Sequence, residues 1–335
     1  MGRALNAGLG ATRPAGRHSA AKRPRRAAIA RPTIVVVNNA QREHQEFMHT
    51  VEAVARENGA VLQALSRDGV AVFPADDTYT PIWRDLAQGR TVIDFATEGE
   101  AAVTVSSCDW VAEPTPHWQL CVRTPMGEAT FSLHMAGQHN VRNALAATAA
   151  ALGAGVPLTL IAQGLQTFEP VKGRSQLRSL TLHGRALTLV DDSYNANPDS
   201  VRAAIEVLAE LPGPQLLVLG DMGEVGDQGP EFHAEAGALA HAAGIPLLFA
   251  LGAQSVHAAS AYGNGQGGVA RHFNEIGALL DAVRQALPTV GSVLVKGSRF
   301  MKMEQVVGAI AAAAPPQEQQ QKSMESLEGP HGATH

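Results

Sequence analysis

The sequence is poor in several features, and each shortage excludes a class of protein. Its 335 residues include two cysteines, Cys108 and Cys121, whose positions match no zinc-ligand spacing. So few cysteines also exclude a small scaffold held by disulfides, and they favour a reducing, cytoplasmic location over an oxidising exterior. No apolar run is long enough to cross a membrane. With 45% hydrophobic residues, the chain is long enough for two domains of ordinary size with their own cores.

Acidic residues are missing from the first 31 positions, which hold eight of the chain's 26 lysines and arginines. The rest carries 18 basic against 31 acidic residues, a net charge of −13. Such a body repels nucleic acid and needs cations such as Mg²⁺ to approach phosphates. Residues 1–31 are expected to be a basic disordered tail, and the glutamine-rich residues 315–335 a second one. A transit peptide, a nucleic-acid-binding arm and sequence foreign to the fold are alternatives for the basic segment.

The first ordered part of the chain is predicted to begin with a buried strand. Thr33-Ile34-Val35-Val36-Val37 is a β-branched run typical of a strand buried on both faces. Nothing before it is expected to supply a neighbour, so the sheet is predicted to lack its first strands and to expose an edge at residues 34–37. A helix at 50–64 and strands at 70–73 and 92–95 follow.

The pattern then turns antiparallel and afterwards helical. Residues 118–122 and 129–133 alternate around Pro125-Met126-Gly127, which predicts a hairpin. Helices are predicted at 140–152 and 158–167, and Pro170 and Gly173 indicate a linker at 168–173. Residues 32–172 are therefore expected to form one α/β domain with a mixed sheet.

Residues 173–314 are expected to form a second domain, which is doubly wound and Rossmann-like. After a hairpin turning at 183–185, strands alternate with helices at the spacing of a parallel α/β sheet. The predicted strands lie at 186–190, 215–219, 246–251 and 292–295, and the predicted helices begin near 198, 230, 252 and 301.

Polar clusters follow three of these strands. They are Asp191-Asp192-Ser193-Tyr194-Asn195-Ala196-Asn197-Pro198, Gly220-Asp221-Met222-Gly223-Glu224 and Lys296-Gly297-Ser298-Arg299. The carboxyl ends of parallel strands meet at one edge of a sheet, where ligands bind in such folds. Helix capping would explain one polar residue in the first cluster but not four in a row. The sequence therefore predicts one ligand site built from three loops.

Two further clusters lie in the first domain. Gly137-Gln138-His139-Asn140-Val141-Arg142-Asn143 opens a predicted helix, and Asn38-Asn39-Ala40-Gln41-Arg42-Glu43-His44 follows the first strand. Asn140 and Asn143 are three residues apart, so both amides are predicted to project from one helix face and to read a base edge. A simple N-cap role for Asn140 and a surface role for His44 are the alternatives.

Taken in order, these clusters and Gly173-Arg174 resemble the Mur ligase family of peptidoglycan synthesis, from about residue 31 to residue 310. The tyrosine-containing acidic loop favours the branch that adds D-alanyl-D-alanine to UDP-N-acetylmuramoyl-tripeptide. The resemblance implies a monomeric cytoplasmic ligase that uses ATP and Mg²⁺ to form an amide bond. The substrate carboxylate would take the γ-phosphate to give an acyl phosphate, which the dipeptide amine would displace. It also implies that 32–172 is a truncated central ATP-binding domain.

The resemblance also implies roles for individual residues. Asn140 and Asn143 would meet the adenine, Arg174 the phosphates and Asp192 the ribose, with Tyr194 beside the nucleotide. Lys296 and Asn195 would be catalytic residues. Substrate would be bound by Asn197, Ser298 and Arg299, and Mg²⁺ by His44.

Two departures from the family pattern stand out. No Gly-Lys-Thr phosphate loop occurs in the chain, because Gly8-Leu9-Gly10-Ala11-Thr12 has no lysine and no predicted strand before it. Asn58 stands where many relatives place a lysine that is carbamylated to bind a second metal. A non-catalytic ligase fragment that binds nucleotide or dipeptide is therefore the competing hypothesis, and a nucleic-acid-binding protein that uses the basic segment is a third.

Overall fold

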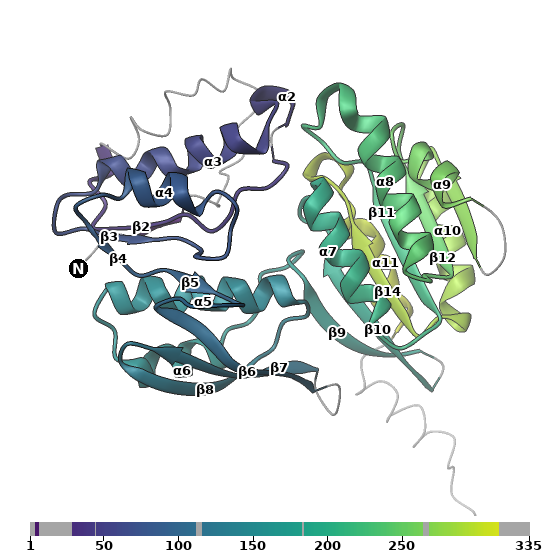
Figure 1. The fold of residues 1–335 in the computed structure, drawn as a ribbon. Coiled ribbons are helices and arrows are strands. Elements are labelled where there is room, and N and C mark those ends of the chain that lie inside the picture. Colours follow the sequence, from purple (N-terminus) through teal and green to yellow (C-terminus); the bar gives the residue numbers. More distant parts are fainter. Residues whose placement is uncertain are drawn as a thin grey trace, which may run out of the picture. The chain divides into compact units, whose positions relative to one another are not determined.

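The chain folds into two compact units, the first made mainly of residues up to Pro170 and the second mainly of residues from Val171 onward (Figure 1). The computed structural model describes residues 4–6, 29–43, 45–111, 116–182, 184–263 and 268–314, with only the backbone at 4–6 and 45. The two expected tails therefore lie almost wholly outside the described residues, and His44 and His183 lie outside them too. Among the described helices, none is long and apolar enough to cross a membrane.

The first unit contains a parallel sheet and a mixed sheet. The parallel sheet has the order β1-β2-β3-β4, formed by Ala4–Asn6, Ile34–Val36, Val70–Val72 and Thr91–Val92. The mixed sheet has the order β5-β6-β7-β8, formed by Phe95–Ala96, Val103–Val111, His117–Thr124 and Gly127–Leu133. The helices of this unit are α2 (Gln45–Met48), α3 (Val51–Gly59), α4 (Thr80–Leu86), α5 (Gln138–Gly153) and α6 (Leu158–Gln166), with a 3₁₀ turn at Ala60–Ala64.

Helix α5 packs against both sheets. Its Val141 and Leu145 share one apolar cluster with Ile34 of the parallel sheet and with Phe95 and Leu120 of the mixed sheet. The opposite face of the parallel sheet is covered by α3 and α4, where the fully buried Trp83 donates its indole N–H to the Ala55 carbonyl at 2.9 Å. These helices lie on either side of β2 and β3 in Figure 1. Strand β2 is therefore buried on both faces, as its β-branched sequence predicts.

The second unit is a six-stranded sheet of order β13-β12-β11-β14-β10-β9, parallel except for the β9–β10 hairpin. Its strands are β9 (Gln176–Leu182), β10 (Arg185–Asp192), β11 (Gln215–Gly220), β12 (Leu247–Leu251), β13 (Val269–Phe273) and β14 (Ser292–Lys296). Its helices are α7 (Pro198–Ala209), α8 (Gly229–Ala242), α9 (Val256–Tyr262), α10 (Ile276–Ala286) and α11 (Glu304–Ala313), with 3₁₀ turns at Leu287–Thr289 and Arg299–Met301. The 3₁₀ turn at Gly226–Gln228 belongs to the first unit.

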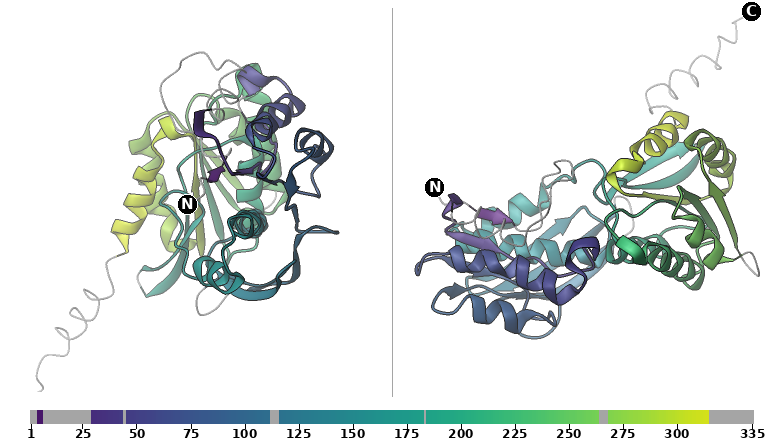
Figure 2. Two further views of the ribbon diagram at one scale, coloured as in Figure 1. Left: turned by 90° about the vertical axis from the view of Figure 1, so that its left-hand side faces the viewer. Right: turned by 90° about the horizontal axis from the view of Figure 1, so that it is seen from above.

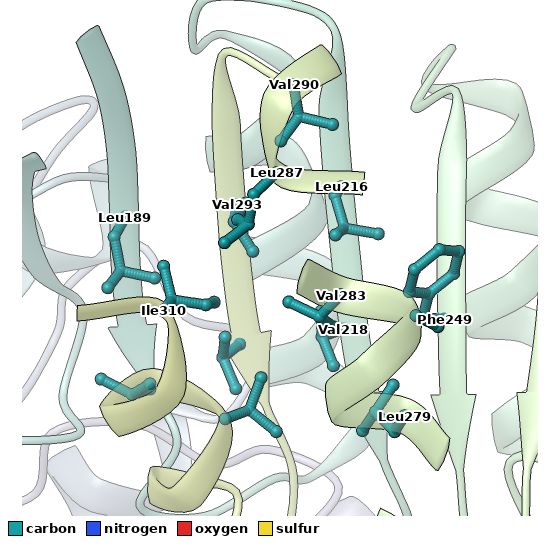
Figure 3. Packing of buried hydrophobic residues seen from close by; sticks show 14 of the residues in the cluster. Leu189, Leu216, Val218, Phe249, Leu279, Val283, Leu287, Val290, Val293 and Ile310 are labelled. Carbon is teal, nitrogen blue, oxygen red and sulfur yellow. The ribbon is translucent and has the colours of Figure 1, made fainter. Parts of the chain in front are cut away.

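Helices cover both faces of this sheet, which confirms the doubly wound prediction (Figure 2). On one face, Leu279 and Val283 of α10 and Ile310 of α11 pack on alternate residues of the central strands, such as Leu189 and Val293 (Figure 3). Alternation places every second strand residue on this face. Burial of each such leucine or valine contributes about 1.5–3 kcal/mol.

Several local predictions were wrong. Strand β1 pairs in parallel with β2, so β2 has a neighbour on each side, and a strand does precede Gly8. The single strand predicted at 92–95 is two short strands, because β4 joins the parallel sheet and β5 the mixed one. The helix predicted from residue 301 begins at Glu304, because Lys302 adopts a left-handed φ of 52° and ends the preceding turn.

A buried histidine fastens the loop that follows β11. The Met222 N–H donates to Nε2 of His233 at 2.9 Å, which places the ring proton on Nδ1, 2.7 Å from the Gly229 carbonyl. Burial lowers the pKa of His233 below its ordinary value, while the Gly229 carbonyl and the Asp221 carboxylate act in the opposite direction. The neutral imidazole is therefore the form that this loop requires.

The lowered pKa of His233 predicts that acid weakens the fold. Above the ordinary histidine pKa of about 6.5, neutral His233 makes its full contribution to the free energy of unfolding. As the pH falls from there toward the lowered folded value, the unfolded chain binds more protons and the free energy of unfolding decreases. Urea unfolding between pH 5 and 8 should show a shallower pH dependence for His233→Gln than for the wild type. His49→Gln, at an exposed position, is the control. Equal slopes for His233→Gln and the wild type contradict the assignment.

The crossing of α8 and α9 predicts a strong effect of one added methyl group. A Cβ at Gly237 would lie 1.9 Å from the Ala258 carbonyl oxygen, whereas a Cβ at Gly308 of α11 would meet no atom within 4 Å. Gly237→Ala should lower the free energy of unfolding by about 1–3 kcal/mol through overpacking. Gly308→Ala should raise it by about 0.5–1 kcal/mol, because alanine is the better helix former. Urea unfolding of both variants checks this, and equal midpoints would refute it.

Candidate active site at the carboxyl ends of the strands

An ion pair between Asp192 and Lys296 lies at the carboxyl edge of the second unit's sheet. These residues end the adjacent parallel strands β10 and β14 and are register partners. Nζ of Lys296 lies 2.5 Å from Oδ2 of Asp192 and donates to the Asn195 carbonyl at 3.0 Å. The lysine side chain is 3% exposed and that of Asp192 16%. The sequence prediction that the loops after these strands meet is confirmed for this pair.

The other carboxylate oxygen of Asp192 faces the segment that opens the second unit. Oδ1 accepts from the backbone N–H of Ser175 at 3.0 Å and from its hydroxyl at 3.3 Å. Asp191 acts on the same segment, because its Oδ2 accepts from the Gly173 N–H at 3.2 Å. Gly173 has a φ of +79°, a conformation that favours glycine. Two consecutive aspartates thus fix residues 173–175 to the end of β10.

Two arginines lie against the ring of Tyr194. The guanidinium carbon of Arg174 is 4.1 Å from the centroid of the tyrosine ring, and that of Arg299 is 5.6 Å from it. Both arginines and Asn195 are exposed, so two positive charges and an amide face solvent beside the ring. Cations held over an aromatic face keep their charge and their N–H donors, which suits the binding of phosphate or carboxylate.

Ser298 and Asn197, which are expected to bind substrate, are not exposed residues in the structure. Ser298 is buried, accepts from the Gly223 N–H and donates to the Ala196 carbonyl. Asn197 is half-buried immediately before α7. Asp221, from the second polar loop, accepts the backbone N–H groups of Gln254 and Ser255, the two residues immediately before α9. Asp221 is therefore structural.

The first unit carries a chain of asparagine amides. Asn38, which follows β2, donates to Asn143 at 2.8 Å, and Asn143 donates to Asn140 at 3.1 Å. The last contact confirms that Asn140 and Asn143 lie on one face of α5. The N-cap alternative for Asn140 is wrong, because Gly137 is the N-cap and Asn140 lies inside the helix, donating to the Ala136 carbonyl.

Of these three asparagines, Asn143 is the one whose side-chain amide can bind a ligand. Its side chain is exposed, while Asn140 is buried. An amide has two protons and an oxygen with two lone pairs, so Asn143 keeps a donor and an acceptor beyond the two bonds described. That pair matches the donor and acceptor on an adenine edge. The exposed amide of Asn143 is therefore chemically suited to a purine base.

Asp76 and Asp77, two acidic residues near α5, were not predicted from the sequence to belong to a site. Nη2 of Arg142 lies 2.7 Å from Oδ1 of Asp76, whose Oδ2 accepts from the backbone and hydroxyl of Thr97. Burial raises the pKa of the neighbouring Asp77. The sequence carried a signal for Asp76 and Asp77, because two consecutive acids come shortly after the strand predicted at 70–73.

The residues fit Mg²⁺ less completely than they fit a nucleotide. Within the described ranges, no group of three or more histidines, cysteines and acids is placed to hold a metal. Asn58 is buried and donates to the Asn39 carbonyl at 3.1 Å. Mg²⁺ often takes only one or two protein ligands besides phosphates and water. The described residues would therefore leave most ligands of a Mg²⁺ ion to be supplied by phosphates and water.

Comparison with known proteins shows which family this chain is similar to. The Mur ligase middle domain matches residues 15–151, which begins inside the segment expected to be a tail, and the Mur ligase glutamate ligase domain matches residues 173–299. The UDP-N-acetylmuramoyl-tripeptide–D-alanyl-D-alanine ligase of Escherichia coli K12 is 35% identical over 285 residues, which cover 84% of this chain and 61% of that protein.

Solved structures agree in fold. MurF from Acinetobacter baumannii matches with a TM-score of 0.76 and 28% identity, over 85% of this chain and 61% of the other. MurF from Thermotoga maritima in complex with ADP matches with a TM-score of 0.71 and 20% identity, over 85% and 63%. This chain spans about three fifths of the length of these relatives. With both domain types matched in order, the chain belongs to the Mur ligase family.

Proposed function

We propose that the chain acts in ATP-dependent amide-bond formation, adding D-alanyl-D-alanine to UDP-N-acetylmuramoyl-tripeptide through an acyl phosphate during peptidoglycan synthesis. We place it in the cytoplasm as a monomer with ATP and Mg²⁺ as its cofactors. The observation that carries the proposal is the polar edge of the second unit's sheet, where Asp192, Lys296, Arg174 and Arg299 converge on the Tyr194 loop. The 35% identity to the Escherichia coli ligase supports this choice of substrates.

The exposed residues of this edge are assigned to the ligands. Arg174 and Arg299 would neutralise phosphate and carboxylate charge, which is the main catalytic requirement in phosphoryl transfer. The amide of Asn195 would orient the reacting groups, and Asn143 of the first unit would hold the adenine. ATP supplies the phosphoryl group that activates the substrate carboxylate. His44 remains the proposed protein ligand of Mg²⁺.

The buried Lys296 and the half-buried Asp192 already bond to the protein in this conformation. Lys296 holds Asp192 and the Asn195 carbonyl, so its ammonium reaches a phosphate only if the ion pair with Asp192 opens. Asp192 already accepts from Ser175 and Lys296, which leaves acceptor capacity on Oδ2 for a ribose hydroxyl. The ligand hydroxyl would therefore approach Asp192 from the side of the lysine.

A second candidate is a non-catalytic fragment that binds nucleotide or dipeptide without turnover. The observation that favours it is the lack of any Gly-Lys-Thr phosphate loop in the 335-residue sequence. Such a loop normally cradles the β- and γ-phosphates with its backbone N–H groups and its lysine. Binding and turnover must therefore be measured separately.

Phosphate release tests the proposed function. The full chain, given ATP, Mg²⁺, UDP-N-acetylmuramoyl-tripeptide and D-alanyl-D-alanine, should release phosphate only when both substrates are present. Asp192→Asn should lower the rate at least about 100-fold. The substitution removes the negative charge that pairs with Lys296 and the carboxylate that would accept from a ribose hydroxyl. The exposed Asp281→Asn, on α10, should leave the rate unchanged.

The negative results are also informative. ADP binding by calorimetry with no phosphate release, in a chain whose circular dichroism shows an intact fold, would replace the ligase proposal by the binding fragment. Release that does not require D-alanyl-D-alanine would contradict the proposed substrate.

A further inference from the structure

Ser298 lies where three loops of the second unit meet. Its Oγ accepts from the Gly223 N–H at 2.6 Å and donates to the Ala196 carbonyl at 3.3 Å. Its own N–H donates to the Asp221 carbonyl at 3.0 Å. One residue of the loop after β14 thus connects the loops after β10 and β11. The residue is 3% exposed, so a ligand at the surface does not reach it in this conformation.

Lys296 bonds to the loop after β10 as well, at the residue before Ala196. Its Nζ donates to the Asn195 carbonyl, and Ser298 donates to the next carbonyl, that of Ala196. Two consecutive carbonyls of the β10–α7 loop are therefore bonded to buried donors of the β14–α11 loop. The side chain of Asn195 is exposed. These two hydrogen bonds to the backbone therefore determine where the Asn195 side-chain amide lies at the surface.

Gly223 provides independent evidence that this junction is closely fitted. A Cβ at position 223 would lie 2.9 Å from the ring of Phe300 and 3.4 Å from Oγ of Ser298. The Gly223 N–H itself lies 2.6 Å from the serine hydroxyl.

We infer that Ser298 is a positioning residue, whose hydroxyl fixes the loop carrying Tyr194 and Asn195 and does not itself contact the ligand. This rests on the proposed function for the identity of the ligands, and it replaces the substrate contact that the family resemblance implies for Ser298. Alanine at this position would leave the Gly223 N–H and the Ala196 carbonyl without their partner. The loop would then sample more conformations, and the ligand would bind more weakly because the loop must be ordered again.

Hydrogen exchange of the full chain without ligand tests this inference. In Ser298→Ala, the amides of residues 193–197 and of Gly223 should exchange at least about fivefold faster, the effect of losing one ordinary hydrogen bond. Ser298→Cys, with a weaker donor and acceptor, should lie between alanine and the wild type. The control Ser179→Ala, at an exposed position of β9, should leave these amides unchanged.

ADP affinity, measured by calorimetry, separates positioning from direct contact. A positioning role predicts that affinity falls in the same order as loop protection, with the wild type first, cysteine next and alanine last. Unchanged exchange at residues 193–197 in Ser298→Ala, with or without a loss of ADP affinity, overturns the inference. Faster exchange throughout the strands in both variants also overturns it, because Ser298 would then support the whole unit.

The outcome does not depend on turnover. If the wild-type chain releases no phosphate, the ligase proposal fails, while the exchange comparison still decides the role of Ser298.

Discussion

The ion pair between Asp192 and Lys296 is the interaction on which the candidate site depends. Its partners end neighbouring parallel strands, so the sheet itself sets their separation. A lysine that is 3% exposed needs its counter-charge, because a buried ammonium without one is strongly destabilising. Each partner also holds another segment: Asp192 holds Ser175, and Lys296 holds the Asn195 carbonyl. The pair therefore links residues 173–175 and the Tyr194 loop to the core of the sheet.

This arrangement separates buried residues that hold the loops from exposed residues that can meet a ligand. Lys296 and Ser298 contact backbone atoms of the loop after β10, whereas Arg174, Asn195 and Arg299 face solvent. Asn140 and Asn143 in the first unit divide in the same way, the first buried and the second exposed. Preorganised sites commonly have this design, in which a supporting layer fixes the groups that perform the chemistry.

Much of the fold could be predicted because its signals are local. Buried strands such as Ile34–Val36 and Ser292–Lys296 are short β-branched or apolar runs, and polar residues after them mark the carboxyl edge. Strand β6 was missed because its centre, Ser106 to Asp109, is exposed and does not alternate. Strand β13 lies at the edge of its sheet, with few buried residues, and together with α10 it was also missed. The pairing of Ala4–Asn6 with β2 is a contact across about thirty residues that no local pattern encodes.

For the site, the sequence indicated which loops meet but not what each side chain contacts. Burial distinguishes Ser298 from Arg299, although the two are adjacent in one polar motif. Ser175 carries no motif at all, yet it holds Asp192. Such roles follow from the register of β10 against β14 and from the positions of carbonyl groups, which only the folded backbone determines.

A double-mutant cycle on Asp192 and Lys296 tests most directly whether this pair organises the site. Urea unfolding of the full chain would compare Asp192→Asn, Lys296→Met and the double variant. The account predicts that each single substitution costs about 3–5 kcal/mol, because it leaves a buried polar or charged group without its partner, and that the double variant costs much less than the sum. Additive effects of the two substitutions would contradict it.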